Sequence, residues 1–381
     1  MTTRSHAARA AAACLVAAVS LCAQGSPAAA SGQAGIEAPL VSDAVFKNVQ
    51  ILKGIPVDEF MDAMGMFSAS LGFDCVSCHT GGIYTNRGAF AEATPLIQRA
   101  RQMIVMTTTI NKNYFGGQPR VSCFTCHHAK NRPEFIPSLA LQYGELVEDP
   151  NSMQIFPDQR TTVDKVFERY LQALGGPERL AALASFTARG TYEGFNTGGN
   201  QFPVEIAARA PNQRTQVVRT PDGNAVKTFD GTSAWAAEGW RPLPLLALTG
   251  GNLETARLEA LVSFPANIRQ AFTNWQVSST TIDGRVVQLA QGSNPGQPPV
   301  NFYFDESGLL TRIVRWNRTA VGTVPIQIAY SEYRPVAGVQ MPFRTVITWT
   351  DGQNTFALTE IQPNVALDAA RFARPAPFKS K

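Results

Sequence analysis

Two short motifs are the part of this sequence whose residue types and spacing could do chemistry. The segments "CVSCH" (75–79) and "CFTCH" (123–127) each hold two cysteines three positions apart, with a histidine directly after the second. This C-x-x-C-H pattern is typical of covalent haem c attachment, in which both thiols add to the haem vinyl groups and the histidine binds iron. The sequence therefore predicts two haem c groups, with thioethers at Cys75, Cys78, Cys123 and Cys126 and proximal iron ligands at His79 and His127.

Other uses of these cysteines fit the spacing less well. Zinc sites built from two C-x-x-C pairs have the pairs roughly 15–20 residues apart, whereas 44 residues separate Cys78 from Cys123. A pair of disulfides or a thioredoxin-like redox pair would leave the histidine after each motif unexplained. Apart from Cys14, Cys22 and His6 near the N-terminus, every cysteine and histidine of the chain lies in the motifs or beside them.

The second axial ligand of each iron is expected to be a methionine, because no spare histidine remains. On a helix predicted between Pro56 and Gly72, Met64 shares an apolar face with Phe60, Phe67 and Leu71, while Met66 points to nearly the opposite side. Methionine on such a face is otherwise ordinary core filler. We predict Met64 as a distal haem ligand.

A second helix, predicted from Thr94 to the glycines at 116–117, repeats this plan before the second motif. Met103 is the predicted distal ligand on it, with Met106 as the alternative. His128 follows His127 directly, so its side chain diverges from that of the proximal ligand. Contact with solvent or with a haem propionate is expected for His128, rather than ligation of the other haem.

The N-terminus predicts export. Arg4 and Arg9 precede an uncharged run from Ala10 to Ala23, and small residues follow at 28–30. This order is that of a secretory signal peptide over 1–30, and it implies a periplasmic or exported protein. Lipidation of Cys22 is the alternative, and it would make the protein membrane-associated. The net charge of +4 comes without a basic stripe, so we expect no nucleic-acid partner.

Pattern changes along the chain predict a multidomain protein. After a spacer (31–44), residues 45–145 read as an all-α dihaem c-type cytochrome domain, and residues 146–160 as a linker. The segment 161–377 begins with helical patterns at 161–176 and 177–186, and 252–272 reads as a helical insertion. The remainder alternates with period two, as in "TRIVRWNRT" and "FRTVITWT", between turn signals such as "TDGQ". Such alternation indicates an α+β domain with an antiparallel sheet.

The haem segments resemble a known family. "VFKNVQILKGIPVDEFMDAMGMFSASLGFDCVSCH" and "ARQMIVMTTTINKNYFGGQPRVSCFTCHH" are similar to those of the cytochrome c subunit of photosynthetic reaction centres. The resemblance covers about residues 45–130, and it implies a helix methionine as sixth ligand, at Met64 and Met103. The full form of that family has four haems, and one of its helices leads to a histidine. This chain has only two motifs, and the loop after Asn111 is shorter and contains no histidine, so the resemblance implies a dihaem relative.

The second half resembles the lipoprotein-sorting (LolA-type) proteins through "YLQALGG", "YSEYRPVAGVQMPF" and "NVALDAARFARP". The resemblance implies a curved antiparallel half-barrel over 161–377 that wraps helices and shelters acyl chains.

The predicted function is an exported dihaem c-type cytochrome that carries single electrons between redox protein partners, with a β-rich accessory module for partner or lipid binding. A haem enzyme such as a peroxidase is one alternative, and Glu59, Asp62 and Asp74 are the acids near the first motif. A lipid- or partner-binding protein with haem as a sensor, attached to the membrane surface through its C-terminal domain, is another. We expect an electron carrier rather than a catalyst.

Overall fold

A computed structural model describes residues 38–379 except 85, 145–150 and 159. The predicted signal peptide and most of the spacer lie outside the described residues. Residues 39–381 form one compact unit, so the predicted boundaries at 145 and 161 stay predictions. No helix in the described part of the chain is long and apolar enough to cross a membrane.

Described residues up to 144 fold into helices joined by short turns, with one isolated bridge between Val41 and Pro56. The all-α class stays a prediction, because this segment includes residues outside the description. The α-helices are α1 (Ser42–Val45), α2 (Val57–Leu71), α3 (Cys75–Cys78), α4 (Pro95–Tyr114), α5 (Cys123–His127) and α6 (Leu139–Tyr143), with 3-10 turns η1 (Gly81–Tyr84) and η2 (Arg87–Ala91).

The two long helices begin and end where their sequences place the signals. Pro56 precedes α2, and Gly72 closes that helix in the left-handed conformation (φ 65°), which glycine adopts without a steric cost. At the start of α4, the Thr94 hydroxyl accepts a hydrogen bond from the Ile97 N–H at 3.2 Å. Pro95 occupies the first helical position, where its missing N–H has no consequence. Both predicted helices are confirmed.

Thirteen antiparallel strands of the described chain form one sheet, which confirms the expected antiparallel topology. The strands are β1 (Ser185–Gly194), β2 (Gln201–Arg209), β3 (Gln213–Thr220), β4 (Gly223–Phe229), β5 (Ala234–Ala237), β6 (Leu246–Ala247), β7 (Asn274–Ile282), β8 (Arg285–Ser293), β9 (Val300–Phe304), β10 (Leu310–Thr319), β11 (Gly322–Val336), β12 (Val339–Trp349) and β13 (Gly352–Pro363). Short 3-10 turns follow β1 (η3, Phe195–Thr197) and β13 (η5, Ala369–Phe372).

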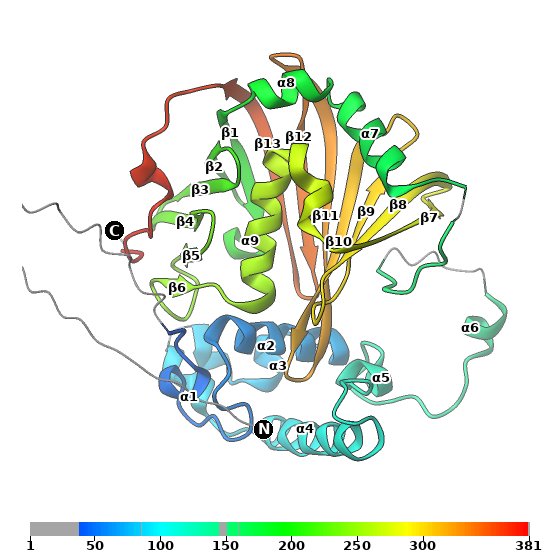
Figure 1. Ribbon diagram of the computed structural model, residues 1–381. Helices are drawn as coiled ribbons and strands as arrows, with labels where there is room; N and C mark the ends of the chain where they lie inside the picture. Colours follow the sequence, from blue (N-terminus) through cyan, green and yellow to red (C-terminus); the bar gives the residue numbers. More distant parts are fainter. Residues whose placement is uncertain (1–37, 85, 145–150, 159, 380–381) are drawn as a thin grey trace, which may run out of the picture. The chain divides into compact units, whose positions relative to one another are not determined.

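The first strand, β1, lies in the middle of the curved sheet, and the last strand, β13, comes back to lie beside it (Figure 1). Strands β1 to β6 run in sequence order to one edge. Helix α9 (Gly250–Ser263) and the 3-10 helix η4 (Pro265–Ala271) then lead to β7 at the opposite edge. From there the strands run back to β13, which pairs with β1. Short hairpin turns set the register of successive strands.

Helices cover one face of this sheet, as Figure 1 shows for α7 (Val163–Ala173), α8 (Pro177–Ala182) and α9. Their apolar side chains and the inward-facing strand residues form the largest core cluster. It includes Tyr170, Ile268, Phe302 and Ile313, each at most 2% exposed. Because alternate strand residues point to opposite faces, the other face needs a cover of its own wherever it is apolar.

The segment that follows the haem motifs provides this cover. Ile155 packs on the cluster formed by Val287, Leu289, Tyr303, Val314 and Trp316, and all five residues of β9 are buried. Polar groups of β10, β9, β8 and β7, in that order, bind the backbone of residues 151–158. The donors are Trp316 to Asn151 (3.1 Å), Asn301 to Ser152 (3.2 Å), Gln291 to Met153 (3.0 Å) and Ser278 to Phe156 (2.6 Å). The described part of the predicted linker is therefore fastened to the sheet.

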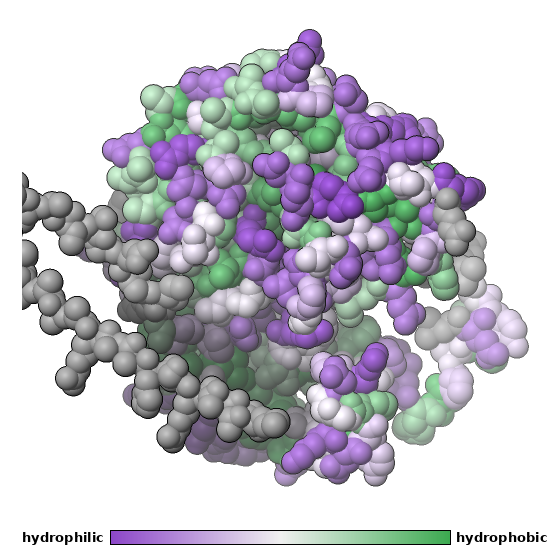
Figure 2. All heavy atoms as spheres, in the orientation of Figure 1, coloured by the Kyte–Doolittle hydropathy of each residue, from purple (hydrophilic) through white to green (hydrophobic). Residues whose placement is uncertain are grey.

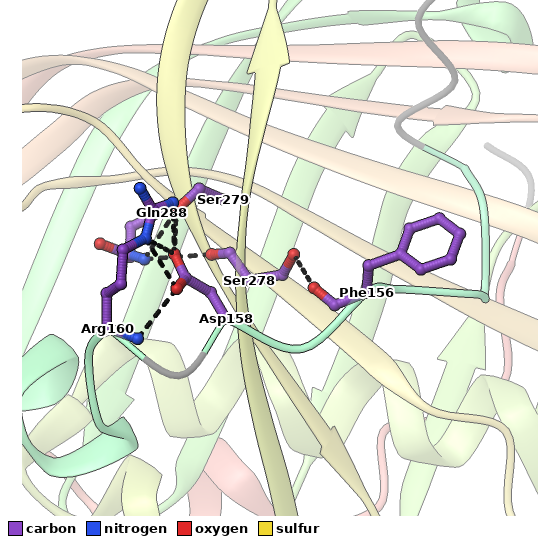
Figure 3. Close-up of polar contacts among 6 residues, drawn as sticks. All are labelled: Phe156, Asp158, Arg160, Ser278, Ser279 and Gln288. Carbon is purple, nitrogen blue, oxygen red and sulfur yellow. Dashed lines mark hydrogen bonds and ion pairs between the residues drawn. The ribbon is translucent and has the colours of Figure 1, made fainter.

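Asp158 adds two further contacts with the sheet and forms a local ion pair with Arg160 (Figure 3). The Asp158 backbone N–H donates to the Val277 carbonyl at 2.7 Å. Its carboxylate accepts hydrogen bonds from Arg160 Nε and Nη2, both at 2.9 Å, and from the Ser279 hydroxyl at 3.3 Å. The Arg160 side chain and backbone lower the pKa of Asp158 to about 2, because they stabilise the charged carboxylate.

Helix α2 binds directly to the start of α9. Asp58 is 1% exposed, and its carboxylate accepts hydrogen bonds from the Thr249 backbone N–H at 2.6 Å and from the Thr249 hydroxyl at 2.7 Å. One turn later, Asp62 accepts from Asn252 at 3.0 Å and from Asn317 at 3.2 Å. A carboxylate beside a helix N-terminus also interacts favourably with the helix dipole.

The helical segment and the sheet also share a hydrophobic cluster. Ala63, Met66 and Ile104 pack there against Val321 and Val324 from the β10–β11 hairpin. The helices that carry the candidate haem residues are therefore stabilised by side chains from more than 200 positions further along the chain.

Replacing Asp58 by alanine should lower the free energy of unfolding by about 1–3 kcal/mol, because the Thr249 N–H and hydroxyl lose their buried acceptor. Denaturant titration of the purified protein measures this change. Asp164→Asn is the matched control, since Asp164 is also a first-turn acid but its side chain is 71% exposed in its pair with Arg269. An equal loss in both variants would show that α2 gains no special stability from α9.

The ion pair of Asp158 should make stability fall in acid. The unfolded carboxyl takes up its proton near pH 4, whereas the folded one holds its charge down to about pH 2. The pair's contribution is therefore present above pH 4 and is lost as the pH falls toward 2. Unfolding midpoints measured between pH 7 and pH 2.5 should converge for wild type and Asp158→Asn as the pH falls. A constant difference across that range would contradict the assignment.

Candidate haem-attachment site

Each C-x-x-C-H motif forms one short capped helical turn. The Asp74 carboxylate accepts the Ser77 N–H at 2.9 Å at the start of α3, and the Asp74 N–H donates to the Ser77 hydroxyl at 3.3 Å. At the start of α5, the Ser122 N–H donates to the Thr125 hydroxyl at 3.0 Å. A hydroxyl residue at the third helical position, visible in "DCVSCH" and "SCFTCH", is the sequence signal for these caps. The sequence interpretation had missed it.

The four cysteines are free thiols, of which Cys123 is buried and Cys75 and Cys126 are exposed. Burial is the main cause that raises the pKa values of Cys75, Cys78 and Cys123. Thiols of redox pairs have lowered pKa values instead. In the described part of the chain, no three Cys, His, Asp or Glu side chains gather in a way that could hold a metal ion.

The second motif holds its histidine in the form that an iron ligand needs. His127 Nδ1 lies 2.9 Å from the Lys130 carbonyl oxygen. A carbonyl oxygen can only accept, so Nδ1 carries the hydrogen, and in the neutral ring Nε2 then has the lone pair that a metal binds. This side chain–backbone contact is common among histidine ligands, because it fixes both the tautomer and the ring orientation.

His79 in the first motif is more enclosed. Its ring packs edge-on against Phe90, with 4.9 Å between the ring centroids, and its Nδ1 is buried without a well-aligned hydrogen bond in the described chain. Burial lowers the pKa of His79, and the nearby Phe90 backbone partly opposes this shift. The neutral imidazole is the form that binds metals.

His128 ends α5 in the left-handed conformation, with φ at 48°. Its side chain is exposed, and its ring lies edge-on to Phe124 at 5.5 Å. This surface position is compatible with the predicted contact with solvent or a propionate, which stays a prediction.

Helix α4 connects the two motifs. At its start, the Thr94 hydroxyl donates to the Cys78 carbonyl at 2.7 Å. Near its end, the Asn111 side chain donates to the Val121 carbonyl at 2.7 Å and accepts the Val121 N–H at 2.8 Å. Twenty residues span roughly 30 Å at about 1.5 Å each. The motifs are therefore held near opposite ends of one rigid element, a role of Asn111 that the sequence interpretation did not foresee.

The structure separates the candidate methionines by their packing. Met66 is 5% exposed in the cluster shared with the sheet, whereas Met64 packs at the margin of that cluster. Met103 is half-buried and Met106 is 41% exposed. The fully buried positions of α4 are Ile104 and Thr107, and Met103 lies one turn before Thr107, at the edge of that buried face. Since α5 contacts both α2 and α4, both methionine helices border the second motif.

These residues fit haem c. Two thiols, an imidazole with a free Nε2 and thioethers on adjoining helices are the donors that such a group uses. Large apolar side chains also reach the surface around the motifs, as suits a flat apolar ring, and Figure 2 shows hydrophobic residues at the surface in the lower part of the view. The exposed large apolar residues of the segments that carry the motifs include Phe90, Leu96, Val105, Met106, Tyr114 and Phe124, each at least 41% exposed.

The acids near the first motif face other groups. Burial raises the pKa of Asp62 to about 6, and this carboxyl lies among Asn252 and Asn317. Burial also raises the pKa of Glu59, which accepts from the Thr249 hydroxyl at 3.3 Å. Asp74 caps α3. Asp58, also in the first turn of α2, is buried and accepts its hydrogen bonds from Thr249 at the start of α9.

The described part of the chain contains two cavities of interest. An open groove of about 1040 Å³ lies between the end of α2 and residues 129–140, but the cysteines and histidines of the motifs do not line it. A second cavity, of about 110 Å³, lies between the sheet and its covering helices. Pockets for small molecules usually hold roughly 300 Å³ or more.

Both the sheet region and the motif region of this chain are similar to known proteins. Residues 247–361 match a family of unknown function. A LolA superfamily protein from Nitrosomonas europaea aligns with 56% of this chain and 98% of its own length, at 10% identity and a TM-score of 0.39. A DUF1329 family protein from Desulfovibrio piger aligns with 55% of this chain and 97% of its own, at 9% identity and a TM-score of 0.40. These scores are too low to assign a function to the sheet region.

The motif region has the more specific likeness. The photosynthetic reaction center cytochrome c subunit of Roseobacter denitrificans is 31% identical over 99 residues, which are 24% of this chain and 26% of that protein. The present chain thus covers about a quarter of that relative. Residues 15–151 match the family described as the photosynthetic reaction centre cytochrome C subunit, and the haem-motif part of the chain is similar to that family.

Proposed function

We propose that this chain is an exported dihaem c-type cytochrome that carries single electrons between redox proteins. Cys75 and Cys78 would hold one haem and Cys123 and Cys126 the other. His79 and His127 would be the proximal iron ligands, and Met64 and Met103 the distal ones. Haem c, when bound, supplies one-electron iron chemistry. A reaction centre is one candidate partner class, because residues 15–151 match a reaction-centre subunit family.

The hydrogen bond of the His127 ring is the observation that carries the proposal. Its Nδ1 donates to the Lys130 carbonyl at the end of a helical turn that also carries both thiols, so the ring presents Nε2. A histidine with a purely structural role would not be expected to follow directly after two free thiols in a C-x-x-C-H motif. With methionine on the far side, both iron faces would be closed, which suits electron exchange rather than turnover of a substrate.

A peroxidase is supported less well. Such an enzyme needs an open iron position and a nearby acid or base. The acids closest in sequence, Glu59, Asp62 and Asp74, are held by Thr249, Asn252 with Asn317, and Ser77. Each carboxyl has a structural partner away from the motif histidines.

For the sheet region we propose a supporting role, with partner or lipid binding as the alternative. Its cavity of about 110 Å³ is small for an acyl chain, since pockets for small molecules start at roughly 300 Å³. Lipid extracted from the purified protein, identified by mass spectrometry, would favour binding of lipid and attachment to a membrane surface.

Double replacement of Cys123 and Cys126 by serine should leave one covalent haem instead of two, since the thioethers of each haem come from one motif. Intact-mass spectrometry of the denatured protein counts the attached groups. The double replacement of Cys75 and Cys78 is the reciprocal variant and should give the same mass. A wild-type protein without haem mass, or one that contains stoichiometric zinc, would overturn the proposal.

Met64→Leu and Met103→Leu should each remove the methionine-to-iron absorption band of one haem and leave the other haem unchanged. Leucine keeps the volume and loses the sulfur, so packing changes cost less than about 1.5 kcal/mol. Ferric absorption spectra and a redox titration report the change. Met66→Leu on the same helix is the control and should leave the spectrum intact. A spectral change in Met66→Leu with none in Met64→Leu would refute the ligand assignment.

A further inference from the structure

The connection between α4 and the second motif is longer than the connection between α2 and the first. Three residues (72–74) separate the end of α2 from Cys75, whereas eight residues (115–122) separate the end of α4 from Cys123. A longer connection leaves more conformational freedom to the two elements that it joins. The position of the second motif against α4 therefore depends more on side-chain contacts.

The Asn111 side chain provides such contacts near the end of α4. Its Nδ2 donates to the Val121 carbonyl at 2.7 Å, and its Oδ1 accepts the backbone N–H groups of Val121 at 2.8 Å and Arg120 at 3.0 Å. The Asn111 backbone carbonyl accepts the N–H groups of Phe115 at 3.1 Å and Gly117 at 2.9 Å. Asn111 thus binds both the first residues of the connection and the last ones before the motif.

These bonds join the second motif to the side of α4 that carries Met103. Val121 directly precedes Ser122, the N-cap residue of α5, so its position sets where the helical turn of the motif begins. Met103, Thr107 and Asn111 are four residues apart and therefore follow one another along one side of α4. Thr107 is buried, and α4 contacts α5. The predicted distal ligand lies two turns, or about 12 Å, before the residue that binds Val121.

We propose that Asn111 is a positioning residue for the haem at the second motif, and that it keeps Met103 within reach of the iron. The inference rests on the proposed function, because it needs haem at this motif and Met103 as its distal ligand. The proximal ligand His127 belongs to α5 and the distal one to α4, so both can bind only while the two helices keep their spacing. Groups that hold the ligands in place in this way act on metal binding without touching the metal.

Titration of the ferric, haem-loaded full chain with imidazole tests this inference. Imidazole competes with a methionine ligand, and loss of the methionine-to-iron absorption band reports its binding. In Asn111→Ala, imidazole should bind one of the two haems about tenfold more tightly, which corresponds to about 1.4 kcal/mol, or one to two net hydrogen bonds. Asn111→Asp keeps the acceptor for both N–H groups and should give an affinity between those of Asn111→Ala and the wild type. The same titration after replacement of Cys75 and Cys78 by serine, which retains only the second haem, should show the full effect.

Two controls separate this role from a general loss of stability. Asn113→Ala removes an exposed asparagine from the same helix and should leave the imidazole affinities unchanged. Asn301→Ala removes a fully buried asparagine on β9, whose side chain donates to Ser152 and Tyr303. It should lower the free energy of unfolding and leave the imidazole affinities unchanged. An equal gain of affinity in Asn301→Ala and Asn111→Ala would overturn the inference, because any destabilised variant would then bind imidazole.

The outcomes separate this inference from the proposed function. Absence of haem in the wild type would refute the function itself. Two haems by intact mass, with equal imidazole affinities in wild type and Asn111→Ala, would refute the role of Asn111 alone. If Asn111→Ala folds poorly, Asn111→Ser provides a second variant without the carboxamide. Loss of the second haem from both would also refute that role, because Asn111 would then serve covalent attachment and not ligation by Met103.

Discussion

The carboxylate of Asp58 is a constraint on which the rest of the structure depends. A buried charge needs hydrogen-bond donors, and Asp58 finds them at Thr249, at the start of α9. This contact fixes the rotation of α2 about its own axis. With Asp58 and Asp62 turned toward the sheet region, Met66 follows into the shared cluster and Met64 stays at its margin. The different packing of Met64 and Met66 thus begins with an acid six residues before Met64.

The local structure was largely predictable from the sequence. Helices α2 and α4 carry their stop and start signals in Gly72, Thr94 and Pro95, and period-two alternation predicts strands such as β10 and β12. The motif chemistry is equally local, because the thiols and the histidine of each site are consecutive. The ligand assignments at Met64 and Met103 nevertheless stay predictions, since helical spacing shows which residues share a face and not what that face meets.

Contacts between distant segments were not predictable. Asp58 and Thr249 lie 191 positions apart, and an acid in the first turn of a helix has a sufficient local explanation in the helix dipole. Residues 151–158 contain Pro157 and polar residues, which read as a connection, and their attachment depends on side chains from four strands. In the same way, the sequence alone shows Gly65 only as a residue of low helix propensity. The structure shows that Asp351 lies against it, where a larger side chain would collide. A single sequence contains no signal for such pairs.

The strap formed by residues 151–158 has a consequence for how electrons would travel. A domain on a flexible linker can move between two partners, and the length of the linker then sets its effective concentration at each of them. Here the segment after the second motif is bonded across β10 to β7, and α2 is bonded to α9. Under the proposed function, a cytochrome held in this way would be a stationary relay. Its partners would have to come to it, and the rate of exchange would follow their diffusion rather than any swing of its own.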